Sequence, residues 1–484
     1  MSDLVTLTIE GHEVEVPAGT SVLEAAKQVG VLIPHYCYHP GLPVAGSCRM
    51  CLVEVEKSPK PLPSCATPVA PGMVVHVASA PAKAARQAVL EFLLINHPLD
   101  CPICDQAGEC ELQDYTYQEG RAAGRYGDYA KRYNPVEDFG PDVLYVPNRC
   151  ILCTRCVRFM EDVAREPLLN VSERGDRAHI AVAEGAPLDH PWAGNVVDLC
   201  PVGSLLSKDF LHKARAWDLD RTASVCTGCT QGCNVMLETR ENAIVRVRPR
   251  PNAEVNRWWM CDVGRLDYAW MNRADRIEAP LLRQGARLGP VDWEGAVERA
   301  ADLFGAAEGP WVALVSPRAS CEALEAAARL LALHGGSGAF RVAEGPEAPL
   351  AGVPDLALRK ERAPNVHGAL AAGFSRDWAA ALARAAKAAL VLVVDDDLHG
   401  VPEPLTSGAL VYVGTVLPEA ARGAAAVLPC TNVAEEEGSF VNVAGRRQHY
   451  DQAKAAPGMA RPAAWILEAL RAAVAGRVGG GARA

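Results

Sequence analysis

The sequence predicts a multidomain α+β and α/β protein, with cysteine-rich modules in the first half and an α/β domain after them. Two observations favour this fold class. Of the 17 cysteines in 484 residues, 15 precede residue 262. After Asp262, cysteine nearly vanishes, and short continuous apolar runs alternate with helical stretches. Such runs are typical of buried parallel strands that are joined by helices.

Composition excludes several classes of protein. A formal net charge of −10 argues against binding to nucleic-acid phosphates. No uncharged apolar stretch of 18 residues is present, so we expect no transmembrane helix. The acidic, alternating N-terminus is unlike a signal peptide, and we expect a cytoplasmic chain. Disulfides are disfavoured in a cytoplasmic chain. The repeated C-x2-C spacing therefore indicates metal binding, either of structural zinc or of iron–sulfur clusters.

The first domain is predicted over residues 1–80. Residues 1–16 alternate as a β-hairpin, and a helix follows with Ser21 and Glu24 as its capping box. The strand-like LVEVE follows the third of four cysteines, spaced C-x10-C-x2-C-x13-C: Cys37, Cys48, Cys51 and Cys65. We expect a plant-type ferredoxin-like domain with a [2Fe–2S] cluster, although the x10 gap departs from the usual C-x4-C-x2-C. Four-cysteine zinc usually has two C-x2-C knuckles, and only one is present.

The second segment is predicted over residues 81–120. An amphipathic helix over Pro81 to Ile95 should bury one face, made of Ala85, Val89, Phe92 and Leu93. One histidine and three cysteines follow at H-x3-C-x2-C-x5-C: His97, Cys101, Cys104 and Cys110. We interpret them as ligands of a [4Fe–4S] cluster. A neutral imidazole in place of a thiolate removes one negative charge and should change the reduction potential.

A bacterial ferredoxin-like [4Fe–4S] domain is predicted over residues 140–218, after a surface linker over 115–148. Its ligands would be three cysteines at C-x2-C-x2-C and a distant C-P pair: Cys150, Cys153, Cys156 and Cys200. A further [4Fe–4S] domain is predicted over 222–278. Its ligands are spaced C-x2-C-x3-C-x27-C with a β-hairpin between the last two: Cys226, Cys229, Cys233 and Cys261.

Residues 279–465 should form the α/β domain, and residues 466–484 a flexible tail. The predicted strands are Trp311–Val315, Val391–Val394, Leu410–Val413 and Ala425–Leu428, with a helix over Glu322–His334. No dinucleotide or P-loop motif is present. Cys321 and Cys430 are assigned to packing, and the run Asp395–Asp397 to a solvated loop rather than a metal site.

The four motifs, in this order, with NHPLDCPICDQAGECELQD nearly word for word, resemble the large iron–sulfur (G) subunit of NADH-quinone oxidoreductase, respiratory complex I. This resemblance covers residues 1 to about 275. A weaker one extends to about 450 and is to the molybdopterin oxidoreductase fold, with EEEGSFVNVAGRRQ as its best local match. The resemblance implies one [2Fe–2S] and three [4Fe–4S] clusters, the first three on the route from flavin to quinone and the last off it.

The second half of the sequence departs from active molybdopterin oxidoreductases in two respects. Active molybdenum relatives commonly carry a lysine two residues after the last cluster cysteine, where this sequence has Val263. We also expect the sequence to lack the final pterin-binding domain. We therefore expect a truncated, degenerate molybdopterin oxidoreductase-like domain without molybdopterin.

The resemblance further implies an electron-transfer subunit without catalytic residues or other cofactor sites. Its partners would be the flavin- and NADH-binding subunit and the ferredoxin-like and quinone-module subunits of the peripheral arm. It would lie on the cytoplasmic side of the inner (cell) membrane and contact it only through them. The alternatives are a subunit of an NAD-linked formate dehydrogenase or hydrogenase, and a zinc-stapled interaction scaffold.

Overall fold

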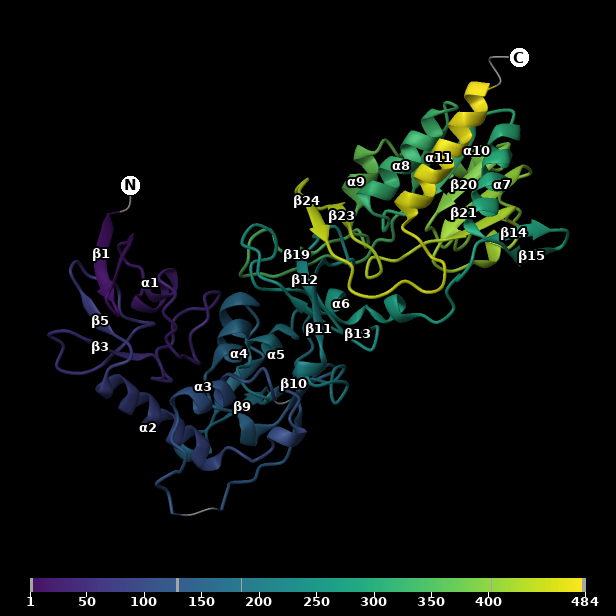
Figure 1. Ribbon diagram of the computed structural model, residues 1–484. Helices are drawn as coiled ribbons and strands as arrows, with labels where there is room; N and C mark the ends of the chain where they lie inside the picture. Colours follow the sequence, from purple (N-terminus) through teal and green to yellow (C-terminus); the bar gives the residue numbers. More distant parts are fainter. Residues whose placement is uncertain (1–2, 128–129, 184, 402, 481–484) are drawn as a thin grey trace. The chain divides into compact units, whose positions relative to one another are not determined.

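The computed structural model describes residues 3–127, 130–183, 185–401 and 403–480. The chain divides into two compact units (Figure 1). The first unit comprises Met1–Leu219 with Leu350–Pro354, and the second comprises Asp220–Pro349 and Asp355–Ala484. Within the described ranges, none of the helices combines the length and the apolar character that crossing a bilayer would require.

Among its described residues, the first unit contains ten short strands and five α-helices. Its strands are β1 (Leu4–Ile9), β2 (His12–Pro17), β3 (Leu52–Val55), β4 (Leu62–Pro63), β5 (Val74–His76), β6 (Glu137–Asp138), β7 (Val143–Tyr145), β8 (Leu169–Ser172), β9 (His179–Val182) and β10 (Leu205–Ser207). Its helices are α1 (Val22–Gln28), α2 (Ala80–Asn96), α3 (Glu111–Glu119), α4 (Arg155–Arg158) and α5 (Asn195–Leu199).

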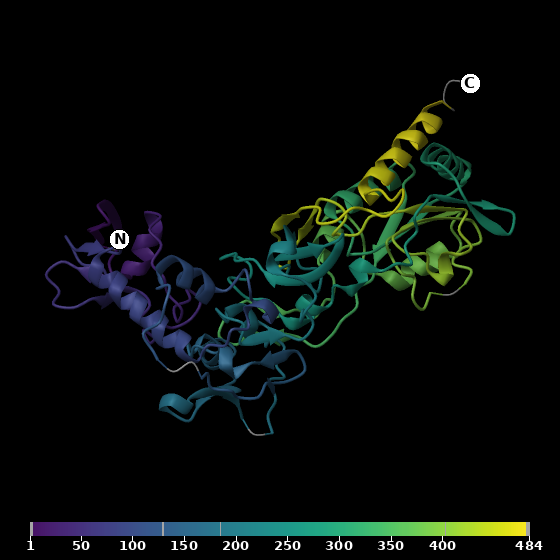
Figure 2. The same cartoon turned by 60° about the horizontal axis from the view of Figure 1, so that its bottom comes forward.

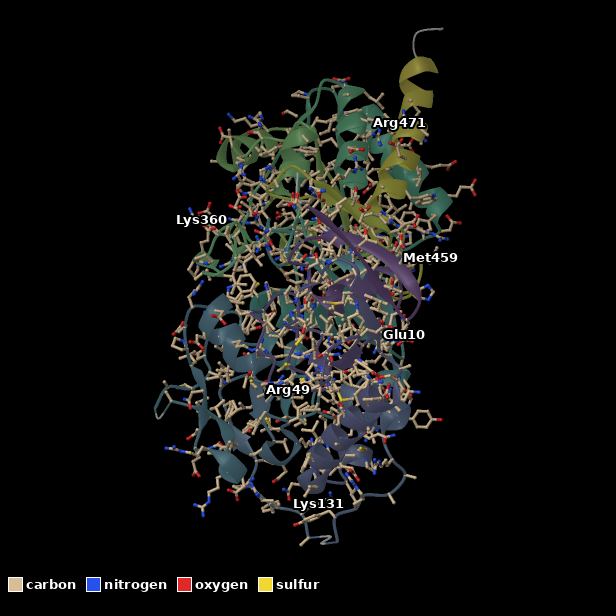
Figure 3. The ribbon with its side chains drawn as sticks, turned by 90° about the vertical axis from the view of Figure 1, so that its left-hand side faces the viewer. Glu10, Arg49, Lys131, Lys360, Met459 and Arg471 are labelled. Carbon is tan, nitrogen blue, oxygen red and sulfur yellow. The ribbon has the colours of Figure 1, made fainter. Side chains whose placement is uncertain are left out.

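The N-terminal sheet has the strand order β2-β1-β5-β3-β4. The predicted hairpin is confirmed: β1 and β2 pair antiparallel around a turn at Glu10 and Gly11, which both have positive φ as a tight hairpin requires. The carboxylate of Glu10, labelled in Figure 3, accepts hydrogen bonds from the backbone N–H groups of Val77 and Ala78. The hairpin is thereby joined to the residues that precede α2.

The predicted apolar face of α2 is confirmed only in part, because Val89 and Leu93 are partly buried against a hydrophobic cluster and Phe92 is exposed. The buried residues are Ala82, Arg86 and Leu90, which repeat every four positions, whereas the side chain of Phe92 is 76% exposed. Arg86 is buried because its guanidinium donates to the Val77 carbonyl at 2.9 Å and pairs with Glu119 of α3 at 3.1 Å. The buried face of α2 therefore combines apolar residues with one arginine whose charge is paired to a distant segment.

The second unit contains β11 to β24 and α6 to α11. Its strands are β11 (Asp220–Val225), β12 (Asn234–Arg240), β13 (Ala243–Pro249), β14 (Leu281–Gln284), β15 (Arg287–Pro290), β16 (Trp311–Val315), β17 (Ser337–Phe340), β18 (Ala348–Pro349), β19 (Ala357–Leu358), β20 (Leu390–Val394), β21 (Ala409–Gly414), β22 (Ala426–Pro429), β23 (Gly438–Val441) and β24 (Arg447–Tyr450). Its helices are α6 (Asp262–Leu266), α7 (Trp293–Ala306), α8 (Cys321–Ala332), α9 (Val366–Ala371), α10 (Trp378–Ala385) and α11 (Ala463–Gly480).

The α/β domain is built on a seven-stranded sheet of order β15-β14-β22-β21-β20-β16-β17. The four predicted strands are confirmed as β16, β20, β21 and β22, and neighbouring strands among them pair in parallel. Their alternating residues supply two hydrophobic cores, one on each face. Helices α7, α8 and α11 pack on one face and α10 on the other (Figure 2).

The expected flexible tail is corrected for residues 466–480. These residues belong to α11, and Ile466, Leu467, Leu470 and Val474 are buried in the core beside α7 and α8. Arg471, labelled on this helix in Figure 3, pairs with Glu468. Residues 481–484 lie outside the described part of the chain.

The interpretation of Asp395–Asp397 as a solvated loop was wrong for two of the three residues. Asp396 is buried and pairs with Arg341 at 2.8 Å, while Asp395 is partly buried and only Asp397 is freely exposed. Arg341 lies 55 residues away in the sequence, so the compensating charge could not be identified from the run itself.

Candidate iron–sulfur sites

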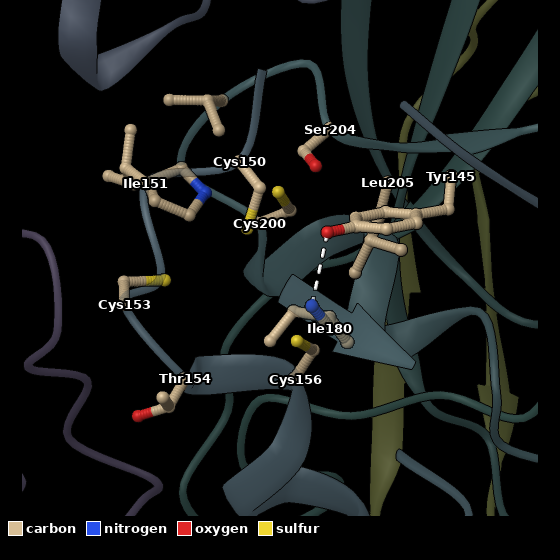
Figure 4. Close-up of a pocket in the computed structure, with 12 residues that line it drawn as sticks. Tyr145, Cys150, Ile151, Cys153, Thr154, Cys156, Ile180, Cys200, Ser204 and Leu205 are labelled. Carbon is tan, nitrogen blue, oxygen red and sulfur yellow. Dashed lines mark hydrogen bonds between the residues drawn. The ribbon is translucent and has the colours of Figure 1, made fainter. Parts of the chain in front are cut away.

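The set comprising Cys150, Cys153, Cys156 and Cys200 surrounds one cavity in the first unit. The four cysteines line this cavity together with residues such as Tyr145 and Ile180. Figure 4 shows all four sulfurs turned toward this common space. The sequence separates Cys200 from Cys156 by 43 residues, and the fold brings them to the same cavity.

The backbone of the loop over residues 150–156 curves around this cavity. Leu152 and Thr154 have φ of 50° and 59°, a left-handed conformation that turns the chain sharply between cysteines. The Leu152 N–H donates to the Cys150 sulfur at 3.4 Å. Amide hydrogen bonds to ligand sulfurs are one of the means by which proteins set the potentials of iron–sulfur clusters.

The set comprising Cys37, Cys48, Cys51 and Cys65 also converges. The Cys37 N–H donates to the Cys48 sulfur at 3.4 Å. The Cys37 thiol lies within hydrogen-bonding reach of Cys48 and Cys65. Cys51 reaches Cys65, and this hydrogen bond lowers the pKa of the Cys51 thiol to about 7. The long x10 gap therefore does not keep the four thiols apart.

In the predicted second set, His97 is the residue at which α2 ends, Cys104 and Cys110 are buried, and Cys101 is exposed. Burial lowers the pKa of His97 to about 4, so its imidazole is neutral at pH 7, which is the form that binds metals. A Cβ added to Gly203 would lie 2.1 Å from the Cys104 sulfur. Only glycine fits beside that cysteine without displacing it.

Three arginines of the segment RCILCTRCVR connect the sets to one another. Arg149 donates to Asp100 at 3.0 Å, and Asp100 is the neighbour of Cys101. Arg155 donates to both carboxylate oxygens of Glu111, the neighbour of Cys110.

The third of these arginines, Arg158, donates to the carbonyls of Cys37, Pro43 and Cys153. Sequence reasoning missed these roles, although the pattern of one arginine before Cys150 and another before Cys156 was a usable signal.

One hydrophobic cluster joins the first three sets. It contains residues from all three, with Cys48 and Cys200 packed against it, and its buried members are Tyr36, Cys37, Met50, Leu90, Cys110, Leu112, Tyr115, Cys153 and Val202. The rings of Tyr36 and Tyr115 lie 5.4 Å apart between centroids. The three predicted sites therefore share one hydrophobic cluster.

The set comprising Cys226, Cys229, Cys233 and Cys261 is buried in the second unit. Two N–H groups donate to its sulfurs at 3.4 Å, Gly228 to Cys226 and Arg359 to Cys229. A Cβ on Gly264 would lie 2.6 Å from the Cys226 sulfur. The predicted β-hairpin between these ligands is confirmed as β12 and β13, and β11 adds a third strand that the sequence pattern did not predict.

The segment EEEGSFVNVAGRRQ packs against this fourth set. Its Gln448 donates to the carbonyl of Gly232 at 2.8 Å and accepts from Asn234 at 2.6 Å, so it contacts both neighbours of Cys233. The segment forms the antiparallel pair β23 and β24. The segment with the best local resemblance to molybdopterin oxidoreductases thus forms hydrogen bonds to the loop that carries Cys233.

The donor sets fit iron–sulfur clusters. In the described part of the chain, no three His, Cys, Asp or Glu side chains gather closely enough to bind a single metal ion. A [4Fe–4S] cluster takes one ligand per iron and suits thiols spaced around a cavity. Burial raises the pKa of Cys153 to about 12 and of Cys200 to about 11, so ligation at these residues releases protons.

The two remaining cysteines are buried, as predicted for Cys430. Cys321 is the first residue of α8, and its thiol donates to the Asn365 side chain at 3.3 Å. Cys430 lines a cavity with Asp395 and Glu436. Burial raises the pKa of Asp395 to about 6 and of Glu436 to about 7.

We expect Glu436→Gln to stabilise the chain at pH 8 by roughly 3 kcal/mol, the equivalent of the shift in pKa. The pKa of Glu436 rises on folding from 4.5 to about 7, so its stabilising contribution is complete below pH 4.5 and is lost as pH rises through 7. Thr431 and Tyr450 donate to different oxygens of Glu436, so glutamine can accept from one hydroxyl through its Oε1 and donate to the other through its amide N–H. Urea unfolding at pH 5.5 and 8 measures the effect. The exposed Glu437→Gln is the matched control and should change neither value.

Models of known families match the chain in the predicted order. They are a 2Fe-2S iron-sulfur cluster binding domain (residues 2–80), the NADH-ubiquinone oxidoreductase-G iron-sulfur binding region (86–125), the ferredoxin-like domain of NADH-quinone oxidoreductase subunit 3 (140–206), the molybdopterin oxidoreductase Fe4S4 domain (219–273) and molybdopterin oxidoreductase (395–473). The predicted succession of 2Fe-2S, 4Fe-4S and molybdopterin oxidoreductase domains is confirmed.

Curated relatives confirm the predicted resemblance. The G subunit of NADH-quinone oxidoreductase from Rickettsia bellii is 43% identical over 299 residues, which are 62% of this chain and 44% of the relative. The 78 kDa subunit of mitochondrial NADH-ubiquinone oxidoreductase from Neurospora crassa is 45% identical to this chain. The match covers 62% of this chain and 40% of the length of that subunit. The matches thus span less than half the length of these relatives.

A solved NAD+-reducing [NiFe]-hydrogenase, in the H2-reduced state, is 32% identical over 43% of this chain and 90% of that one, with a TM-score of 0.39.

Proposed function

We propose that this chain is an electron-transfer iron–sulfur subunit of an NADH-quinone oxidoreductase. Electrons would come from the flavin of a partner subunit that oxidises NADH, and would leave through ferredoxin-like and quinone-module subunits. The complex would lie on the cytoplasmic side of the cell membrane. The identity to the G subunit from Rickettsia bellii and the order of the matched domains support this proposal.

The proposed ligands form four sets. One [2Fe–2S] cluster would be held by Cys37, Cys48, Cys51 and Cys65. Three [4Fe–4S] clusters would be held by His97 with Cys101, Cys104 and Cys110, by Cys150 with Cys153, Cys156 and Cys200, and by Cys226 with Cys229, Cys233 and Cys261. When bound, these clusters supply one-electron transfer. No molybdopterin is proposed, since Val263 stands where active relatives commonly carry a lysine.

The observation that carries the proposal is the hydrophobic cluster around Tyr36, Leu90 and Tyr115. It packs against cysteines of all three sets in the first unit. Its apolar side chains lie between the sets, and Arg149, Arg155 and Arg158 hold the loops to one another by hydrogen bonds. A packed interior that fixes redox groups relative to one another suits electron transfer, because the protein's part is to bind and orient its cofactors.

The test is to purify the full chain anaerobically, measure iron, and record EPR spectra after reduction with dithionite. We expect about 14 iron atoms per chain, the sum over one two-iron and three four-iron clusters, and separate two-iron and four-iron signals. NADH should reduce these centres only when the NADH-oxidising flavoprotein is present. Zinc in place of iron, molybdenum with pterin, or oxidation of NADH by the chain alone would each contradict the proposal.

A further inference from the structure

Arg158 differs from the two other arginines beside the cysteine sets in how its charge is compensated. Arg149 forms an ion pair with Asp100 at 2.9 Å, and Arg155 forms one with Glu111 at 3.1 Å. All hydrogen bonds of Arg158 go to neutral acceptors, which are the Cys37, Pro43 and Cys153 carbonyls and the Thr154 hydroxyl. Among the described residues, no carboxylate forms an ion pair with its guanidinium within 4.0 Å, and the acidic group that acts on it, Asp162, does so only from a longer distance.

The position of Arg158 is shared by two cysteine sets. One guanidinium nitrogen donates both to the carbonyl of Cys37, in the first set, and to that of Cys153, in the third set, at 3.3 Å from the latter. The other terminal nitrogen donates to Pro43, on the long loop between Cys37 and Cys48. The side chain is half-buried, so water screens its charge less than on an open surface.

We infer that the charge of Arg158, which forms no ion pair within 4.0 Å with any described residue, raises, together, the reduction potentials of the clusters held by the Cys37 set and by the Cys150 set. The inference rests on the ligand assignment proposed above. A cluster with four thiolate ligands is anionic, and reduction adds a further negative charge. A fixed positive charge nearby stabilises the reduced form more than the oxidised form, and net charge is one of the determinants of cluster potential.

The test is a redox titration of the reconstituted full chain followed by EPR, in wild type and Arg158→Gln. At a fixed applied potential, we expect the variant to show about a tenfold lower ratio of reduced to oxidised cluster for both centres, a shift of about 59 mV for a one-electron couple. The two other four-iron centres should keep their potentials. Arg158→Lys retains the charge and should shift both centres less than Arg158→Gln.

The matched control is Arg165→Gln, which removes an equal charge from an exposed position of the same segment and should leave both potentials unchanged. If Arg158→Gln retains its iron and moves only one potential, or neither, the inference is wrong. If wild type lacks the two signals, the ligand assignment itself fails, and the inference fails with it.

A second variant applies if Arg158→Gln loses iron. Thr154→Asp would place a carboxylate at the position from which the Thr154 hydroxyl now accepts a hydrogen bond from Arg158 at 3.3 Å. Aspartate tolerates the left-handed backbone at residue 154. Both potentials should fall relative to the neutral Thr154→Asn, and unchanged potentials would refute the shared role.

Discussion

A chain with Cys200→Ala is expected to bind about ten iron atoms in place of about fourteen, because one four-iron cluster loses a ligand. The three other cysteines of this set lie on one short loop, and Cys200, distant from them in the sequence, lines the same cavity. Electron transfer from the flavoprotein to quinone should fall more than about 100-fold, beyond the usual effect of residues outside the ligand shell. Iron analysis and the loss of one four-iron EPR signal measure the result.

Cys430→Ala is the matched control for this experiment. Cys430 is a buried cysteine, but it lies in the second unit and outside the four sets. Its iron content and EPR spectrum should equal those of wild type. A Cys200→Ala chain that kept all its iron and both classes of signal would remove Cys200 from the ligand assignment.

Glu435→Gln is expected to destabilise the second unit by about 3–5 kcal/mol, the typical cost of leaving one member of a buried ion pair without its partner. The Arg276 and Glu435 side chains are 4% and 0% exposed and make a bidentate contact at 2.6 and 2.7 Å. Arg276 also donates to the carbonyls of Thr415 and Cys430. The pair therefore ties the segment after the fourth set to the ends of β21 and β22.

Urea unfolding at pH 7.5, followed by circular dichroism, measures this effect, and the transition of the second unit should move to lower urea. Glu419→Gln is the control, because Glu419 pairs with Arg422 on the surface, where the side chains are 70% and 67% exposed. Such a pair contributes less than about 1 kcal/mol. If both variants moved the urea transition equally, the buried ion pair would contribute no more to stability than the surface ion pair does.

The sequence by itself determined the features that depend on neighbouring residues. Cysteine spacing alone defined the four candidate ligand sets. The hairpin at Glu10 and Gly11 and the strand Trp311–Val315 followed from alternation, turn residues and continuous apolar runs. These signals are local, because a hairpin or a ligand loop is set by the backbone preferences of a few consecutive residues.

Only the tertiary structure decided the features that depend on distant partners. The burial of Arg86 on α2 follows from its contact with Glu119, and the burial of Asp396 follows from Arg341. The C-terminal residues are helical because α7 and α8 offer an apolar surface to α11. The hydrophobic cluster between three cysteine sets also depends on contacts between distant segments. The same holds for the position of Arg158, which contacts two of these sets. Burial and charge compensation belong to contacts between segments, and no periodicity within one segment encodes them.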